Sequence, residues 1–385
     1  MTDFIPSFKG NIILALSAFL ISGCGSGFES KNLSSLVDGS YFQESASTDF
    51  IRAGEKLVTD CKASGELCVF LKNPVAQSGS VVSKSNEGSL RALQNFSVKL
   101  NGLDRSGYME NAHFDVRTAG NKRISFEKIL VEKGVGVERS EWLTANAYFW
   151  LNRASEYLKN NFKEFPLKDE KISVYVDDAF NGWSYEQKSI HLSGSELSAL
   201  SADVVLLLYG EAQIGVATKG SIYNYDQNFH KSCGGKENNC CVDSKGCAKA
   251  LVQASGDVLV NFLFEDLSGV GEFYHQDLKG QSVCGKHRRP EDFSNPDFNE
   301  AYNLCSSEKG KVSAMATAYA SCWYGLKNEF GSKKVLEVYL KHLSLLNGSD
   351  TFETALQKAS TTAQNLGYTA LAKRYLLLFP ICAAP

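Results

Sequence analysis

The spacing of apolar residues along the chain changes near residue 140. Before that point, short runs alternate apolar and polar positions, as half-buried strands do. The strands predicted from these runs are Phe96–Leu100 and His113–Val116. The continuous apolar run Cys68–Leu71 is a further predicted strand. Asn73-Pro74 and Asn101-Gly102 follow two of these strands and are typical of turns. The pattern predicts a small β-rich or mixed N-terminal domain over residues 46–140.

After residue 140, apolar residues recur every three or four positions, which indicates amphipathic or buried helices. The predicted helices are 141–162, 203–216, 248–264, 312–329, 333–345, 351–364 and 368–378. Asp350 with Glu353 is typical of an N-terminal cap and its reciprocal acid.

Two short runs, 172–176 and 189–192, predict strands that form a hairpin or a sheet edge. Asp177-Asp178 follows the first run. We interpret this pair as a turn rather than as catalytic acids, because Asp favours turns and no partner motif accompanies it.

The N-terminus carries an apolar run, residues 11–22, that is too short to span a bilayer as a helix. It ends in Leu20-Ile21-Ser22-Gly23-Cys24, which resembles the lipobox of bacterial lipoprotein signal peptides. The resemblance implies removal of residues 1–23 as a signal peptide, acyl chains on Cys24 and a flexible tether over 24–45. It therefore implies membrane attachment in the bacterial cell envelope. The outer membrane is favoured because Gly25 differs from the Asp of an inner-membrane retention signal.

Composition narrows the class of protein further. The 385 residues are 43% hydrophobic and 22% charged, as in ordinary globular chains. A net charge of −3 provides no basic surplus for binding nucleic acid, so we expect no nucleic-acid partner.

The chain has 11 cysteines, many for a cytosolic protein. Apart from Cys24, an even number remains as disulfide candidates: Cys61, Cys68, Cys233, Cys240, Cys241, Cys247, Cys284, Cys305, Cys322 and Cys382. A zinc knuckle near His230 is the alternative for the four central cysteines. Their C-x6-CC-x5-C spacing matches no common zinc pattern, so disulfides are favoured. The pairing does not follow from the sequence.

Several segments, in order, resemble thermolysin-like and fungalysin-like zinc peptidases. Leu143–Phe162 resembles the helix that precedes the active site, and Asp203–Glu211 (DVVLLLYGE) resembles the family's D-V-V-x-H-E-Y-G-H helix. Gln253–Asp257 (QASGD) falls on the family's E-G-x-x-D pattern. Leu100–Tyr108 and Tyr319–Leu326 resemble flanking segments. The resemblance implies an α+β thermolysin-like peptidase fold, in which a mixed β-sheet with helices leads into an all-helical subdomain.

On this resemblance the N-terminal domain precedes a site subdomain over 141–270 and a cysteine-containing loop with a helical subdomain over 271–385. The family's zinc site needs two His and a Glu as ligands and a second Glu as general base. Residue by residue, the resemblance places this chemistry on the following positions: Leu207 and Glu211 for the two His ligands, Leu208 for the general base, Gln253 for the third ligand, Asp257 for the supporting acid and Ser313 for a later catalytic His.

Leucine offers no lone pair, so we expect no metal, no cofactor and no catalytic residue of the family type at these positions. None of the six histidines has the H-x-x-x-H spacing, and we interpret each as a surface or core residue. The leading hypothesis is a non-catalytic pseudopeptidase lipoprotein that binds a peptide or protein in the former cleft or acts as a scaffold. Two alternatives remain: a metal-dependent hydrolase with relocated ligands from Glu211, Asp257 and a distant His, or a purely structural envelope lipoprotein.

Overall fold

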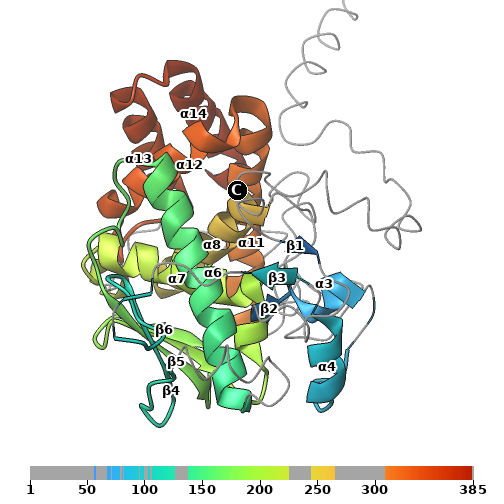
Figure 1. Ribbon diagram of the computed structural model, residues 1–385. Coiled ribbons are helices and arrows are strands. Elements are labelled where there is room, and N and C mark those ends of the chain that lie inside the picture. The colour runs from blue at the N-terminus through green and yellow to red at the C-terminus, as the bar shows by residue number, and fades with distance from the viewer. Residues whose placement is uncertain are drawn as a thin grey trace, which may run out of the picture.

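The computed structural model describes residues 56–57, 67–70, 72–78, 80, 82–94, 96–98, 103–104, 106–125, 138–224, 244–264 and 308–383 (Figure 1). Within these ranges the protein is α+β, which confirms the predicted class. The signal-peptide and tether predictions, including the lipid anchor at Cys24, concern residues that lie outside the described ranges.

The N-terminal unit contains a three-stranded antiparallel sheet. Its strands run in the order β1 (Lys56–Leu57), β3 (Phe96–Val98) and β2 (Leu67–Val69). Two helices accompany it, α3 (Pro74–Ser78) and α4 (Glu87–Leu93). The unit is therefore mixed rather than only β.

The predicted turn at Asn73-Pro74 is wrong, because Pro74 is the first residue of α3. The Asn73 side-chain oxygen accepts a hydrogen bond from the Ala76 amide at 2.8 Å, so it caps the helix. Proline fits the position after the cap because its missing N–H would have no partner there and its φ is already helical.

The larger sheet has four strands in the order β4 (Phe114–Thr118), β5 (Ile172–Asp178), β7 (Ser189–Ser193) and β6 (Gly182–Ser184). The first three are parallel, so the hairpin or sheet edge predicted for 172–176 and 189–192 is wrong. The hairpin instead joins β7 to β6, which is an antiparallel edge strand. β4 falls within the range predicted for the N-terminal domain, yet it pairs with β5 along its whole length. The sheet that supports the site subdomain therefore begins well before residue 141.

Helices α6 (Arg139–Asn161) and α7 (Ala202–Ala217) pack against this sheet. Alternate residues of β5, namely Ile172, Val174 and Val176, are buried, whereas the residues between them are part-exposed. One face of the sheet therefore supplies the core, as the period of two requires. The 3-10 turns η3 (Ser198–Leu200) and η4 (Ser221–Tyr223) flank α7.

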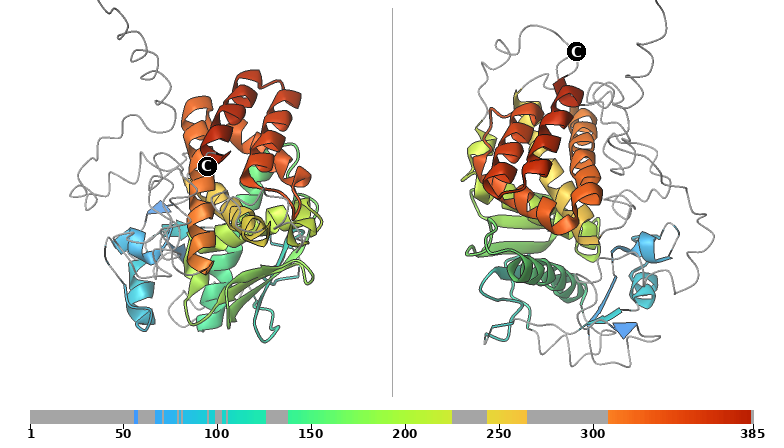
Figure 2. Two further views of the ribbon diagram at one scale, coloured as in Figure 1. Left: turned by 180° about the vertical axis from the view of Figure 1, so that it is seen from behind. Right: turned by 90° about the horizontal axis from the view of Figure 1, so that it is seen from above.

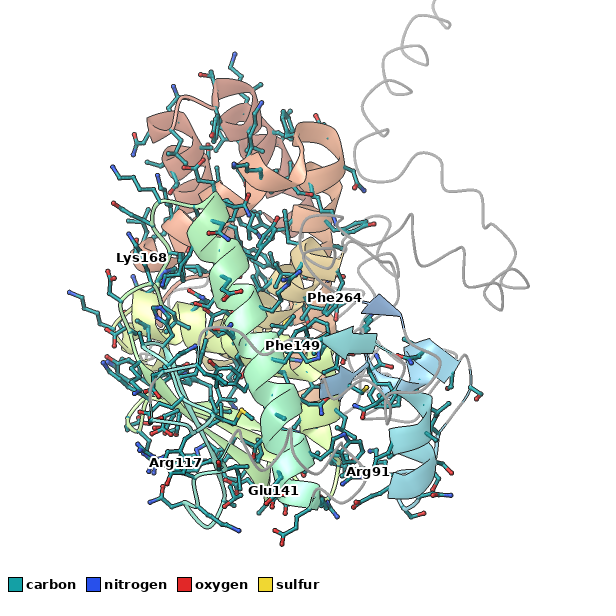
Figure 3. The ribbon with its side chains drawn as sticks, in the orientation of Figure 1. Arg91, Arg117, Glu141, Phe149, Lys168 and Phe264 are labelled. Carbon is teal, nitrogen blue, oxygen red and sulfur yellow. The ribbon has the colours of Figure 1, made fainter. Side chains whose placement is uncertain are left out.

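The N-terminal unit is joined to α6 and α7 by buried polar contacts. The Gln94 side chain accepts a hydrogen bond from Trp142 Nε1 at 2.8 Å and donates one to Asn146 at 3.2 Å. The guanidinium of Arg91 lies 4.2 Å from the centroid of the Trp142 ring, and Figure 3 shows this arginine between α4 and α6. These contacts fix the unit against the first helix of the site subdomain.

The C-terminal part is helical, with α8 (Ser244–Phe264) leading to α11 (Glu308–Phe330), α12 (Ser332–His342), α13 (Phe352–Asn365) and α14 (Thr369–Ala383). η7 (Leu343–Leu345) follows α12. Figures 1 and 2 show α12, α13 and α14 at the end of the molecule away from the four-stranded sheet. Among described residues, Cys247–Phe264 is apolar and long enough to cross a membrane, but 83% of it is buried inside the protein, as in a core helix.

The predicted cap at Asp350 is displaced by one residue. Thr351 is the N-cap of α13 and exchanges hydrogen bonds with Thr354, whose amide donates to Thr351 Oγ1 at 3.1 Å. Asp350 instead accepts from Lys358 and from the Thr354 hydroxyl. Threonine performs the reciprocal role that the sequence pattern assigned to Glu353.

Cys322 on α11 is a free, fully buried thiol, so its prediction as a disulfide candidate is wrong. Its side chain belongs to the continuous hydrophobic core of the protein. Cys68 and Cys247 are disulfide-bonded. The other candidates are not described at the side-chain level and stay predictions: Cys61, Cys233, Cys240, Cys241, Cys284, Cys305 and Cys382.

An aromatic cluster around Trp323 fills the centre of the helical part. Its ring centroid lies 4.7 Å from that of Tyr339, 4.9 Å from that of His342 and 5.1 Å from that of Tyr375. Burial lowers the pKa of His342 to about 4, and its Nδ1 lies 2.5 Å from the Tyr339 carbonyl oxygen. His342 is therefore neutral near pH 7.

We expect the free energy of unfolding to fall as the pH drops from 6.5 to about 4. An unfolded histidine takes up its proton near pH 6.5, whereas folded His342 resists protonation down to about 4. The unfolded state thus binds the extra proton first, which costs the fold up to about 3 kcal/mol. Urea denaturation across this range should show the loss in the wild type and little of it in H342F. H113N, which alters a part-exposed histidine, should keep most of it, and an unchanged slope in H342F would contradict the assignment.

Candidate functional site

Two glycines allow α7 and α8 to approach each other closely. A Cβ on Gly210 would lie 2.6 Å from the Cα of Gly256, and a Cβ on Gly256 would lie 2.5 Å from the carbonyl oxygen of Leu207. Real Cβ atoms do not approach neighbours so closely, so only glycine fits at both positions. Ser255 reinforces the contact by donating to the Gly210 carbonyl oxygen at 2.9 Å. This packing brings the two segments that resemble the peptidase site together.

The start of α7 is fixed by Asp203, a fully buried carboxylate. It accepts hydrogen bonds from the Ser201 hydroxyl at 2.6 Å and from the Asn73 amide at 3.3 Å. The Ala202 amide also donates to the Lys72 carbonyl oxygen at 2.6 Å. A buried charge needs such partners, and one of them, Asn73, comes from the N-terminal unit. The orientation of α7 therefore depends on that unit.

The resemblance aligns Leu207 with the first His ligand of zinc peptidases and Leu208 with their general base. Leu207 is 8% exposed and Leu208 is 3% exposed, and both belong to the continuous hydrophobic core. Leu207 packs directly on Gly256 of α8. Burial of each side chain contributes about 1.5–3 kcal/mol of transfer free energy. At these two positions the helix stabilises the fold and offers no group that ionises or binds a metal.

Gln253 of α8 and Ser313 of α11 are in direct contact. Gln253 Nε2 donates to the Ser313 hydroxyl at 3.0 Å, across 60 residues of sequence. Ser313 is 2% exposed and lies within α11 rather than ahead of it. This hydrogen bond engages the amide at the position of the family's third ligand.

Asp257 is one turn further along α8 and is 1% exposed. Its negative charge contributes to raising the pKa of Tyr339, after burial and the charge of Tyr319. The carboxyl group therefore faces the helical part of the protein.

Glu211 is half-buried on α7, toward η4 and the edge strand β6. Burial is the main cause that raises the pKa of Tyr223, and the negative charges of Glu211 and Glu186 add to it. Trp183 of β6 packs nearby, because a Cβ on Gly215 would lie 2.5 Å from its Nε1 and 3.0 Å from the Tyr223 hydroxyl. An aromatic and acidic surface thus connects the α7 helix to the sheet edge.

The donor chemistry at these positions does not fit zinc. Two leucines offer no lone pairs, and one carboxylate with one neutral amide cannot replace two imidazoles and a carboxylate. In the part of the chain that the structure describes, no three His, Cys, Asp or Glu side chains are grouped closely enough to hold a metal ion. No step of zinc-dependent hydrolysis can therefore be assigned to these side chains.

A second group of polar residues, not predicted from the sequence, lies on the larger sheet. His191 Nδ1 is 2.8 Å from Asp178 Oδ2, and His191 Nε2 is 2.9 Å from the Ser189 hydroxyl. Asp178 is the last residue of β5, so the prediction that Asp177-Asp178 forms a turn is wrong. In the sequence, the i, i+2 spacing of Ser189 and His191 indicates that both side chains lie on one face of a strand. In the structure that strand lies beside the end of β5.

Serine, histidine and aspartate in this order also form the hydrolase triad. A nucleophile must reach its substrate, whereas Ser189 is 0% exposed. In this conformation the three residues are a hydrogen-bonded relay and not a nucleophilic site.

The chain matches no model of a known protein family and no curated protein in sequence comparisons. The assignment of its site therefore rests on the residues and contacts described above.

We expect G256A to destabilise the protein by about 1–3 kcal/mol, because the added methyl group would overlap the backbone of α7 at Leu207. Urea denaturation followed by circular dichroism measures the change. G88A is the matched control, since a Cβ there meets nothing closer than 3.7 Å. Its midpoint should stay near that of the wild type. An equal effect of both substitutions would contradict the close approach of α7 and α8.

Proposed function

We propose that this chain is a non-catalytic pseudopeptidase with a degenerate thermolysin-like fold, held in the bacterial cell envelope by a lipid on Cys24. Its role is to bind a peptide or protein segment, or to act as a scaffold, at the membrane surface. The lipobox at residues 20–24 supports the anchor and the favoured outer-membrane location.

The observation that carries the proposal is the replacement of the reactive positions by groups that pack or form neutral hydrogen bonds. Leu207 and Leu208 are buried, and Gln253 bonds to Ser313. The positions still lie on two helices in close contact, as a peptidase-like site requires. The simplest reading is a retained framework without the catalytic groups.

The edge strand β6 supports a binding role. It pairs with β7 on one side and lies at the end of the sheet order, beside the aromatic surface of Trp183 and Tyr223. An extended peptide adds to such an edge through main-chain hydrogen bonds. The deep burial of Leu207 and Leu208 favours a scaffold instead, because buried side chains at the base of the former cleft offer a ligand little apolar surface.

Grafting the missing ligands tests the proposal. The variant L207H/L208E/E211H/Q253E should bind about one zinc ion per chain, because it restores two His one turn apart and a Glu on the facing helix. The wild-type chain, with disulfides intact, should retain almost none after incubation with zinc and dialysis. Elemental analysis gives the zinc content of both.

L207H alone is the control and should bind no more zinc than the wild type, since one imidazole does not make a site. Stoichiometric zinc in the wild type would overturn the pseudopeptidase proposal and favour relocated ligands. A folded graft variant without zinc would overturn the thermolysin-like arrangement itself.

Tryptophan fluorescence separates binding from scaffolding. Trp183 is the part-exposed tryptophan at the sheet edge, whereas Trp142, Trp150 and Trp323 are buried. Short peptides selected against the chain from a display library should change the fluorescence saturably, and W183F should lose that change while retaining binding. A library that yields no binder above a control protein would favour the scaffold.

A further inference from the structure

A chain of hydrogen bonds crosses from the end of β5 to β7. It runs from Asp178 to His191 and on to Ser189, with separations of 2.8 and 2.9 Å. The Ser189 hydroxyl also lies 3.4 Å from the Gln187 side-chain oxygen. Four side chains thus form one hydrogen-bonded chain, in which the His191 imidazole lies between Asp178 and Ser189.

The imidazole ring of His191 is also held between two aromatic rings. The Tyr175 ring stacks on it at 5.3 Å between centroids and the Phe180 ring at 4.7 Å, with interplanar angles of 25° and 20°. Phe180 is 54% exposed, although His191 beneath it is only 8% exposed. The exposed ring is therefore held in place by its contact with the histidine.

The relay lies next to the edge strand. His191 pairs with Gly182 and Ser189 pairs with Ser184 in the β6–β7 ladder. Between β5 and β6, the Asn181 side-chain oxygen accepts a hydrogen bond from the Ser193 amide at 2.8 Å. Residues 179–181 are thereby attached to β7 through both Asn181 and the Phe180 ring.

The relay can accept a proton without leaving a donor or acceptor unpaired. With neutral His191, Nδ1–H donates to the Asp178 carboxylate and Nε2 accepts from the Ser189 hydroxyl. In the cation, Nε2–H donates to Ser189 Oγ, and the serine proton turns to the Gln187 oxygen. The cation also gains a charged partner in Asp178 and two ring faces.

Among the residues that the structure describes, few other charges face the imidazole. Asp178 and Tyr175 come from β5, and β6 contributes the uncharged Gly182 and Ser184. Arg117 of β4 lies beyond Tyr175, its partner in the sheet register. Asp177 points elsewhere, to Arg139 at 3.5 Å. The charge of His191 therefore acts mainly on Asp178 and the two rings.

We infer that the Asp178–His191–Ser189 relay is a proton-operated latch on the sheet edge. Protonation of His191 strengthens its contacts with Asp178 and Phe180 and holds residues 179–184 more firmly against β7. Acidification thus stiffens the edge strand, whether or not a peptide binds there.

Amide hydrogen exchange of the whole chain tests the latch. It is compared at about pH 5.5 and about pH 7.5, which bracket the range of ordinary histidine titration. After correction for intrinsic exchange rates, residues 179–184 should be protected about three- to five-fold more at the lower pH, the size expected for a cation–π contact of part-exposed rings. H191F keeps a stack of three rings but takes up no proton, so it should lose the difference.

D178N keeps an oxygen acceptor but removes the carboxylate charge, so it should reduce the difference, while the ring contacts of the imidazole retain part of it. H113N, which alters another histidine at the start of the same sheet, should retain it in full. Unchanged protection in α8 shows that each variant is folded. Equal protection of 179–184 at both pH values in the wild type would overturn the latch, and so would a difference that persists in H191F. A difference of undiminished size in D178N would overturn the part assigned to Asp178.

Discussion

The close contact between α7 and α8 is the constraint on which the rest of the candidate site depends. Gly210 and Gly256 let the two backbones meet, and a methyl group at either position would overlap the other helix. This contact places Leu207 and Gly210 of α7 against Ser255 and Gly256 of α8, and Gln253 of α8 is hydrogen-bonded to Ser313 of α11. A helix pair set at this distance keeps its geometry even when the side chains between the helices change their chemistry.

Side-chain chemistry between such helices is governed by desolvation. An imidazole or carboxylate buried there without a metal has to remain neutral or find partners, as His342 shows elsewhere in the core, where burial lowers its pKa to about 4. Leucines at 207 and 208 remove that cost and add apolar burial. A framework of this kind becomes more stable when it has no metal to hold, which is consistent with the proposed loss of catalysis.

Much of the helical structure was predictable from the sequence, because periodicity over long segments is a strong signal. The helix predicted at 203–216 is α7, and the strand predicted at 172–176 is the core of β5. The assignment of β4 to the N-terminal domain failed because parallel pairing with β5 joins segments over 50 residues apart and leaves no local pattern. The N-cap of α13 is Thr351 and not the predicted Asp350. Both residue types are good N-caps, and only the backbone conformation distinguishes the two positions.

The candidate site was predictable only in part. The resemblance assigns Gln253 and Ser313 to one site, and the two side chains are hydrogen-bonded. The Asp178–His191–Ser189 relay was not predicted, because it forms across a bulged parallel ladder between β5 and β7. Histidines were judged by metal-ligand spacing, and a relay needs only one histidine with an acid and a hydroxyl from neighbouring strands.

The free thiol at Cys322 has a consequence for the other end of the chain. The sequence contains 11 cysteines, so once this one is set aside, ten remain, and they can all pair only if Cys24 pairs as well. Acylation of Cys24 leaves an odd number, and one more cysteine must then keep a free thiol or bond to another molecule. Because Cys322 is a free thiol, acylation of Cys24 and disulfide pairing of all ten other cysteines exclude each other. A protein anchored through Cys24 and a protein with five disulfides are therefore different covalent species.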